Sequence, residues 1–149
     1  MTNDSLSQDA TGQQQDQIPR VSPRPRRPNE TRKLAWKGQT VFVTIGYRDD
    51  HVTPCEIFYA SGYRAGSDME VLVGDLCIAL SVMLQQQAMT IGILRKSMSE
   101  AFDMQTGKRE PASILGLLLE ELGRPPEWSA DLANGMRTTE GEGGADEQE

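Results

Sequence analysis

The stretch "CEIFYASGYRAGSDMEVLVGDLCIAL", residues 55–80, contains the change from strand to helix that decides the fold. Its first residues follow the two-residue period of a strand, whereas apolar side chains after Ser67 recur every three or four positions, as in a helix. Two glycines lie in the loop between them. The strand is predicted to place Cys55, Ile57 and Tyr59 on one side and Glu56 and Phe58 on the other.

The start of this helix is marked by its capping residues. Ser67 is followed three residues later by Glu70, the spacing of a capping box, and Asp68 suits the positive end of the helix dipole. Apolar residues then recur over so wide a face that we expect a largely buried helix. This set consists of Met69, Leu72, Val73, Leu76, Ile78, Ala79, Leu80, Val82, Met83 and Leu84.

The residues before this stretch predict two more strands. "TRKLAW" (31–36) and "TVFVTIGY" (40–47) are rich in β-branched and aromatic residues, and "KGQ" between them suits a tight turn. "RDDHVTP" (48–54) predicts a second turn before the strand that begins at Cys55. We therefore expect a small antiparallel sheet of three strands.

The residues after it predict further helices. Thr90 can cap a second helix, and "EPASILGLLLEELG" (110–123) reads as a third, with Pro111 in its first turn and Gly123 as its stop. The expected fold class is α+β. It consists of a small antiparallel three-stranded sheet, followed by two to three helices packed on one face, with disordered tails.

The ends of the chain differ in charge from its middle. Residues 1–37 carry seven Lys and Arg against four Asp and Glu, whereas residues 120–149 carry two against nine. We expect residues 1–30 to be a disordered, basic arm rich in Pro and Arg, residues 31–123 to be the folded domain, and residues 124–149 to be a disordered acidic tail.

Composition excludes several classes of protein. No stretch approaches about 18 continuous apolar residues and the N-terminus has no secretion signal, so we expect a cytoplasmic protein without membrane contact.

Cys55 and Cys77 are too few and too far apart for a disulfide scaffold or a zinc site and read as buried thiols. His51, beside Asp49 and Asp50, reads as a solvated turn residue. No metal or cofactor is expected.

The loop before the helix has two interpretations. Gly62, Arg64, Gly66 and Ser67 could bind a phosphate or nucleotide, because free backbone N–H groups and a cation favour an anion at a helix N-terminus. The same residues could simply turn the chain and cap the helix, and the first-turn carboxylates would then repel an anion.

The arm offers a second candidate site. Arg24, Arg26 and Arg27 alternate with prolines that keep the chain extended, and such an arm could contact nucleic-acid phosphates. It could equally be a solvated linker that keeps an acidic protein soluble. Residues 1–35 contain no aromatic side chain, so the stacking platforms typical of single-strand binders are absent there.

The middle of the chain also resembles a known family. "TVFVTIGYRDDHVTPCEIFYASGYRAGSDMEVLVGDLCIALSVMLQQ" (40–86), with "ILRKSM" (93–98) and "PASILGLLLEEL" (111–122), is similar to the TSCPD domain. That module occurs near the C-terminus of adenosylcobalamin-dependent ribonucleotide reductases and also as a free-standing protein. The family's Thr-Ser-Cys-Pro-Asp run would fall on "ASILG", where only Ser113 agrees, so no role of the missing Cys and Asp carries over.

The resemblance implies a protein related to deoxyribonucleotide synthesis, and a family label could read ribonucleoside-diphosphate reductase. Reduction of a ribonucleotide needs a radical cysteine, a reducing cysteine pair and a large barrel, which 149 residues with two isolated cysteines do not supply. No catalytic residue is therefore assigned. The expected function is a non-catalytic accessory or regulatory module that docks to a ribonucleotide reductase or another nucleotide-metabolism protein, with a nucleotide as a candidate ligand. The alternatives are a nucleic-acid-associated protein that uses the arm and a structural module without a ligand.

Overall fold

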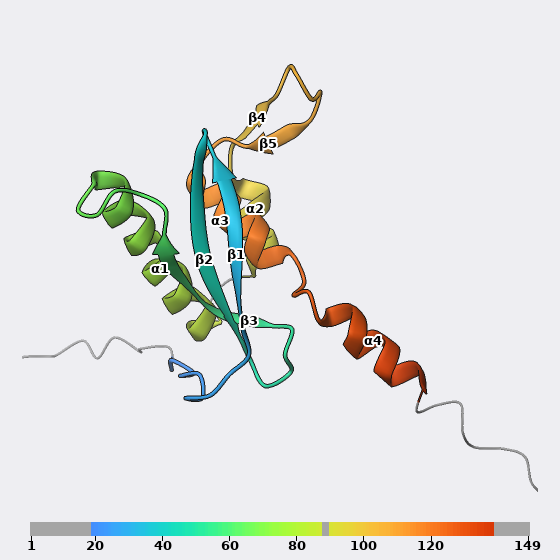
Figure 1. Cartoon of the computed structure of the whole chain (residues 1–149). Coiled ribbons are helices and arrows are strands. Elements are labelled where there is room, and N and C mark those ends of the chain that lie inside the picture. Colours follow the sequence, from blue (N-terminus) through green and yellow to red (C-terminus); the bar gives the residue numbers. More distant parts are fainter. Residues whose placement is uncertain (1–18, 88–89, 139–149) are drawn as a thin grey trace, which may run out of the picture.

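The computed structural model describes residues 19–87 and 90–138. The chain first forms strands β1 (Asn29–Trp36), β2 (Gln39–Tyr47) and β3 (Pro54–Ser61), followed by helices α1 (Asp68–Gln86) and α2 (Ile91–Ser97). A short hairpin of β4 (Glu100–Phe102) and β5 (Arg109–Pro111) comes next, then α3 (Ile114–Gly123) and α4 (Ser129–Thr138). In Figure 1 the short hairpin lies at one end of the sheet and α4 extends away from the other.

The predicted α+β class and the three-stranded sheet are confirmed. The strands are antiparallel in the order β1-β2-β3. Lys37 (φ 45°) and Gly38 (φ 79°) form the β1–β2 turn, and two successive positive φ angles are typical of the type I′ turns that match strand twist. At the second turn, the Asp50 carboxylate accepts hydrogen bonds from the N–H groups of Val52 (3.0 Å) and Thr53 (2.8 Å), which hold the loop closed.

One core joins the sheet to α1 and α3. It is built from apolar side chains that alternate along the strands and recur at helical spacing, and all of them are shielded from water. These are Val41, Val43, Ile45 and Ile57 from the sheet, Val73, Cys77 and Leu80 from α1, and Leu118, Leu119 and Leu122 from α3. Both helices therefore cover the same face of the sheet, as expected, and the opposite face stays open.

The prediction that α1 is largely buried is wrong. One face of α1 packs on the sheet, but 56% of Val71, 49% of Leu72 and 63% of Ile78 is exposed. The reason is geometric: a sheet of three strands covers one side of a helix, and no described element lies against the other side. The wide apolar face read from the sequence thus includes an exposed part.

The third helix begins later than its sequence suggested. Pro111 ends strand β5 and does not lie in the first helical turn. Instead Ser113 is the N-cap of α3, since its Oγ accepts a hydrogen bond from the N–H of Gly116 at 3.1 Å. The β4–β5 hairpin was not predicted, because strands of three residues carry no measurable period. Helix α4 lies within residues 124–149, which were expected to be a disordered tail.

The described structure extends beyond residues 31–123 at both ends. The Tyr47 N–H donates to the carbonyl of Pro28 at 2.9 Å, so the end of the arm follows the sheet. On the other side, the Trp128 ring packs edge-on against Tyr47, with centroids 5.3 Å apart, and its Nε1 donates to the His51 carbonyl at 2.7 Å. The remaining parts of the expected arm and tail, residues 1–18 and 139–149, lie outside the described residues. Among the described residues no helix is long and apolar enough to cross a membrane.

A buried arginine ties β1 to the end of α3. Only 5% of the Arg32 side chain is exposed, and its guanidinium forms ion pairs with the carboxylates of Glu30 (2.8 Å) and Glu121 (3.3 Å). It also donates to the Tyr47 hydroxyl at 3.1 Å. Its remaining acceptors are the carbonyl oxygens of Glu121 (2.5 Å), Arg124 (3.1 Å) and Pro125 (3.1 Å). These carbonyls lie where α3 ends, and that of Glu121 also accepts a backbone hydrogen bond from the Arg124 N–H at 3.2 Å, so Arg32 acts as a side-chain cap for that end.

We expect Arg32→Ala to lower the free energy of unfolding by about 3–5 kcal/mol, because it removes the buried cation that faces the carboxylates of Glu30 and Glu121 and the carbonyls at the end of α3. Arg32→Lys should recover only part of this loss, since an ammonium group cannot reproduce the planar fork. Urea unfolding monitored by circular dichroism measures both. Lys33→Ala is the matched control at an exposed neighbour, with an expected effect within about 0.5 kcal/mol. A similar small loss for Arg32→Ala would contradict this role.

The stability of the fold should also fall at alkaline pH through Tyr47. Burial raises the pKa of Tyr47 from 10.0 to about 12, helped by the nearby Glu30 and opposed by Arg32. As the pH rises, the unfolded chain therefore loses the phenolic proton before the folded protein does. The stabilisation that the protonated Tyr47 provides is complete below pH 10 and is lost as the pH rises to 12. In urea titrations across this range, wild type should lose stability relative to Tyr47→Phe. If the free energy of unfolding changes with pH in the same way for both proteins, the pKa of Tyr47 is not raised in the folded state.

Candidate functional site

The predicted phosphate loop lies between β3 and α1. Ser67 is the N-cap of α1, and its Oγ accepts a hydrogen bond from the Glu70 N–H at 3.3 Å, which confirms the predicted start of the helix. The Glu70 carboxylate reaches back to the N–H of Gly66 at 2.5 Å. This is the capping-box exchange displaced by one residue, and it places a carboxylate where a bound anion would have to lie.

Other N–H groups of the loop also donate hydrogen bonds to acceptors within the protein. The Ser67 N–H donates to the Arg64 carbonyl at 3.0 Å, and the Tyr63 N–H donates to the hydroxyl of Tyr59 at 2.7 Å. The rings of Tyr59 and Tyr63 stack with centroids 6.4 Å apart, which stiffens the start of the loop. The Arg64 side chain is exposed and makes no hydrogen bond or ion pair with any described residue. The loop thus offers an anion one free cation but few free N–H groups.

Gly62 has a structural reason to be glycine. Its φ is 138°, and a methyl group there would lie 2.5 Å from the Thr40 carbonyl oxygen and 2.7 Å from the Cα of Val41. The side chain of Gln39 donates to the Gly62 carbonyl at 2.5 Å, so the loop lies directly against the start of β2. Gly66 also has a positive φ, 75°, but a methyl group there would meet open space. These contacts support the structural interpretation of the loop.

The arm is attached to the rest of the protein at several points. The Val21 N–H donates to the Gln85 carbonyl at the end of α1 at 3.1 Å, and Arg24 pairs with Asp49 of the β2–β3 turn at 3.2 Å. Arg27 forms an ion pair with Glu56 of β3, whose side chain is only 6% exposed. Arg26 is exposed and has no hydrogen bond or ion pair among the described residues. Of the three arginines predicted for nucleic-acid contact, Arg26 is thus the one whose charge is not already paired.

Glu56 occupies its position because the strand beside it carries no side chain there. Gly46 pairs with Glu56 across β2 and β3, and a methyl group on Gly46 would approach Glu56 Cγ to 2.7 Å. The carboxylate therefore lies close against the sheet, where Arg27 covers it. Sequence reasoning placed Glu56 on the open face but could not anticipate the arginine of the arm as its partner.

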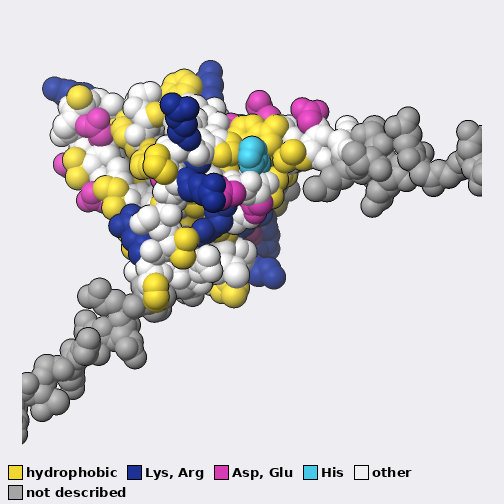
Figure 2. Space-filling model, turned by 90° about the horizontal axis from the view of Figure 1, so that it is seen from below, with side chains coloured by type: hydrophobic (Ala, Val, Ile, Leu, Met, Phe, Trp, Pro, Cys, Tyr) yellow, Lys and Arg dark blue, Asp and Glu magenta, His cyan; other side chains and the backbone are white. Residues whose placement is uncertain are grey.

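The arm and the open face of the sheet border an open pocket of about 420 Å³. Pro25, Arg26 and Arg27 line it from the arm, and Thr44, Glu56 and Phe58 from the sheet. Figure 2 views the protein from the end where the arm and the β2–β3 turn lie, and Lys and Arg side chains cross the middle of this face with hydrophobic side chains between them. This volume is within the range of small-molecule sites.

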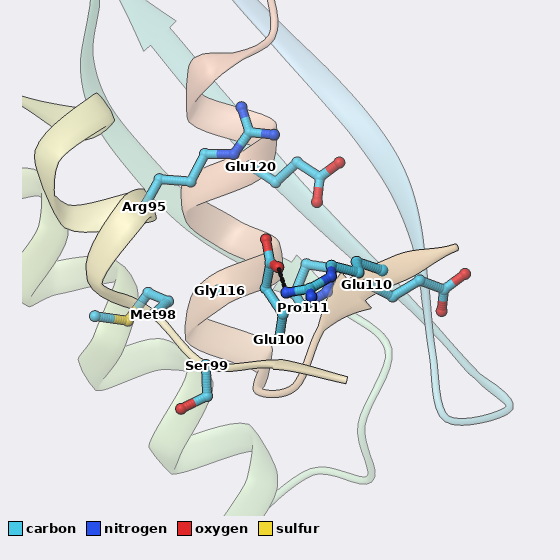
Figure 3. A pocket seen from close by; sticks show the side chains of 9 residues that line it. Arg95, Met98, Ser99, Glu100, Glu110, Pro111, Gly116 and Glu120 are labelled. Carbon is cyan, nitrogen blue, oxygen red and sulfur yellow. Dashed lines mark hydrogen bonds and ion pairs between the residues drawn. The ribbon is translucent and has the colours of Figure 1, made fainter. Parts of the chain in front are cut away.

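A second pocket lies between α2, the β4–β5 hairpin and α3 (Figure 3). It contains the carboxylates of Glu100, Glu110 and Glu120 and the guanidinium groups of Arg95 and Arg109, with Arg109 and Glu100 paired at 3.4 Å. Its volume of about 80 Å³ is below that of a nucleotide site, and its carboxylates outnumber its cations. It is therefore a poor site for a phosphate ligand.

The two cysteines are buried thiols. Both Cys55 and Cys77 are free and buried, as predicted, and burial raises the pKa of Cys77 to about 11 and also raises the pKa of Cys55. Both are therefore protonated thiols at neutral pH, whereas nucleophiles and metal ligands are thiolates. No group of three or more potential metal ligands occurs within residues 19–87 and 90–138.

Sequence reasoning missed two features of these surfaces. Arg32 shares the alternation of Leu34 and Trp36, and this spacing was the available signal that its side chain faces the core. Phe58 was correctly predicted to lie on the other face of its strand from Ile57. That it lines a pocket with Arg26 depends on the path of the arm, for which the sequence has no periodic signal.

The two interpretations of the loop differ in what its glycines do. If the loop is a structural corner, Gly62→Ala should destabilise the fold by at least about 1 kcal/mol more than Gly66→Ala, because it adds a backbone clash to the unfavourable positive φ. Thermal and urea unfolding measure the difference. Arg64→Ala is the control and should change stability by less than about 0.5 kcal/mol. Equal losses for both glycine variants would contradict the corner interpretation.

Comparisons of the chain with protein-family models, with curated proteins and with solved structures find no match. The resemblance to the TSCPD domain accordingly stays a hypothesis that depends on the residues quoted for it.

Proposed function

We propose that this protein is a non-catalytic accessory module that binds an enzyme of deoxyribonucleotide synthesis through the outer face of α1. The observation that carries this proposal is the exposed apolar surface formed by Val71, Leu72 and Ile78, called here the α1 stripe. Val71 and Ile78 are seven residues apart and therefore lie on one side of the helix. An apolar helix face of this kind is the usual element that one protein inserts into the groove of another.

The charges beside the α1 stripe restrict the kind of partner. Helix α1 has no Lys or Arg, and Asp75 lies between Val71 and Ile78 on the same side. Asp68 and Glu70 add two further carboxylates at the start of the helix. A partner that fits this surface has an apolar groove bordered by Lys or Arg, because an acidic border would be repelled.

Two observations support an accessory role over catalysis. The thiols of Cys55 and Cys77 are buried and protonated, so neither is the thiolate that nucleophilic attack or disulfide exchange requires. Residues 31–122 resemble a module that accompanies ribonucleotide reductases, which supports an enzyme of that pathway as the partner. A nucleotide at residues 62–67 is not part of the proposal, since the Gly66 and Ser67 N–H groups already have partners.

The test is affinity capture from the native cell with wild type and with the double variant Leu72→Glu/Ile78→Glu, followed by mass spectrometry. Wild type should enrich a ribonucleotide reductase subunit or another deoxyribonucleotide-forming enzyme, and the double variant should lose it. Both positions are about half exposed or more, so the variant should remain folded, which circular dichroism checks.

Met104→Glu is the matched control, because Met104 is an apolar residue that is 89% exposed in the β4–β5 hairpin, away from α1. It should capture the same enzyme as wild type. The proposal fails if wild type enriches no enzyme of this pathway, or if the double variant and the control capture it equally.

A further inference from the structure

The open face of the sheet has a surface unlike that of α1. On this face the register aligns Thr31 of β1, Thr44 of β2 and Phe58 of β3 in one row across the strands. The hydroxyl groups of Thr31 and Thr44 are 2.9 Å apart, which confirms that their side chains share this face. In the next row Lys33 pairs with Phe42. The face thus combines small polar, aromatic and basic side chains.

Two phenylalanines lie on neighbouring strands, Phe58 opposite Thr44 and Phe42 opposite Ser61, with a register shift between Phe42 and Val43. Phe58 is 49% exposed on β3, and Phe42, two residues from Thr44 on β2, is half-buried. Aromatic rings on neighbouring strands can each contact one of two adjacent flat ligands. Aromatic rings on an open sheet are the surface on which unpaired bases stack, because every base has a flat apolar face.

The cations on this face are arranged around the phenylalanines. Lys33 is exposed beside Phe42, and Arg26 lines the same pocket as Phe58. Neither side chain has an ion-pair partner among the described residues. The carboxylate of Glu56 is neutralised by Arg27, so the face has a net positive charge, in contrast to the acidic α1.

We propose that the open face of the sheet binds single-stranded nucleic acid. One base stacks on Phe58 within the pocket of about 420 Å³, and a second base stacks on Phe42. Arg26 and Lys33 contact the phosphates on either side, and Asn29 and Thr44 offer hydrogen-bonding groups to the base in the pocket. The arm thereby gains the aromatic neighbours that its own sequence lacks.

A single strand fits this surface better than a duplex. Stacking on a side chain requires a base whose face is free, and the bases of a duplex are already stacked on one another. A duplex could contact Arg26 and Lys33 through its phosphates but could not use Phe58. The nucleic-acid proposal uses the open face of the sheet, whereas the proposed function uses the α1 stripe. Each proposal can therefore fail while the other holds.

The test is fluorescence anisotropy of labelled oligodeoxythymidylate and oligouridylate of about 12 nucleotides, at about 50 mM salt. Wild type should bind at least one of them more tightly than a duplex of the same length. Phe58→Ala should weaken binding about tenfold. Arg26→Ala should make the slope of log affinity against log salt less steep by about 0.7, as expected for one lost phosphate contact.

The control variants remove an aromatic ring or a cation from surfaces away from the open face of the sheet. Phe102→Ala removes an aromatic ring that is 64% exposed in the β4–β5 hairpin, and Lys96→Ala removes an exposed cation from α2. Both variants, and Leu72→Glu/Ile78→Glu, should bind the oligonucleotide like wild type. The inference is overturned if wild type binds neither single strand, if a duplex binds as tightly, or if Phe58→Ala and Phe102→Ala have the same affinity.

Discussion

The buried guanidinium of Arg32 is the constraint on which the arrangement of the other elements depends. A charged group inside a protein is costly unless each of its donors has an acceptor, and Arg32 meets this condition only if the end of α3 lies over β1. That position brings Leu118, Leu119 and Leu122 onto the sheet face already covered by α1. With both helices on one side, the other side of the sheet is left to solvent and to the arm.

The sequence predicted those parts of the fold that local chemistry determines. The β1–β2 hairpin follows from a turn whose residues tolerate positive φ, and the start of α1 follows from Ser67 and Glu70. The exposed side of α1 could not be predicted, because the hydrophobic period does not show how wide a surface the sheet will offer. For the same reason the partner of Glu56 and the neighbours of Phe58 appear only once the arm is placed.

The two faces of the protein differ in chemistry in a way that suits two kinds of partner. The helical side presents apolar residues among carboxylates, and the sheet side presents aromatic residues among cations. A single ligand seldom matches both surfaces, since favourable charges on one would be repelled by the other. Such a division is what a module needs if it is to hold an enzyme and an anionic chain at the same time.

The β2–β3 turn connects the two ends of the described chain. Asp49 of this turn pairs with Arg24 of the arm, and the His51 carbonyl accepts the hydrogen bond of Trp128 just before α4. Asp50 keeps the turn closed between them. Asp49 and His51 thus place the contact of the arm and the contact of Trp128 two residues apart on one turn. Arg24 and Trp128, more than 100 residues apart in sequence, are therefore both attached to this turn, so a substitution that changes the path of the turn acts on both contacts.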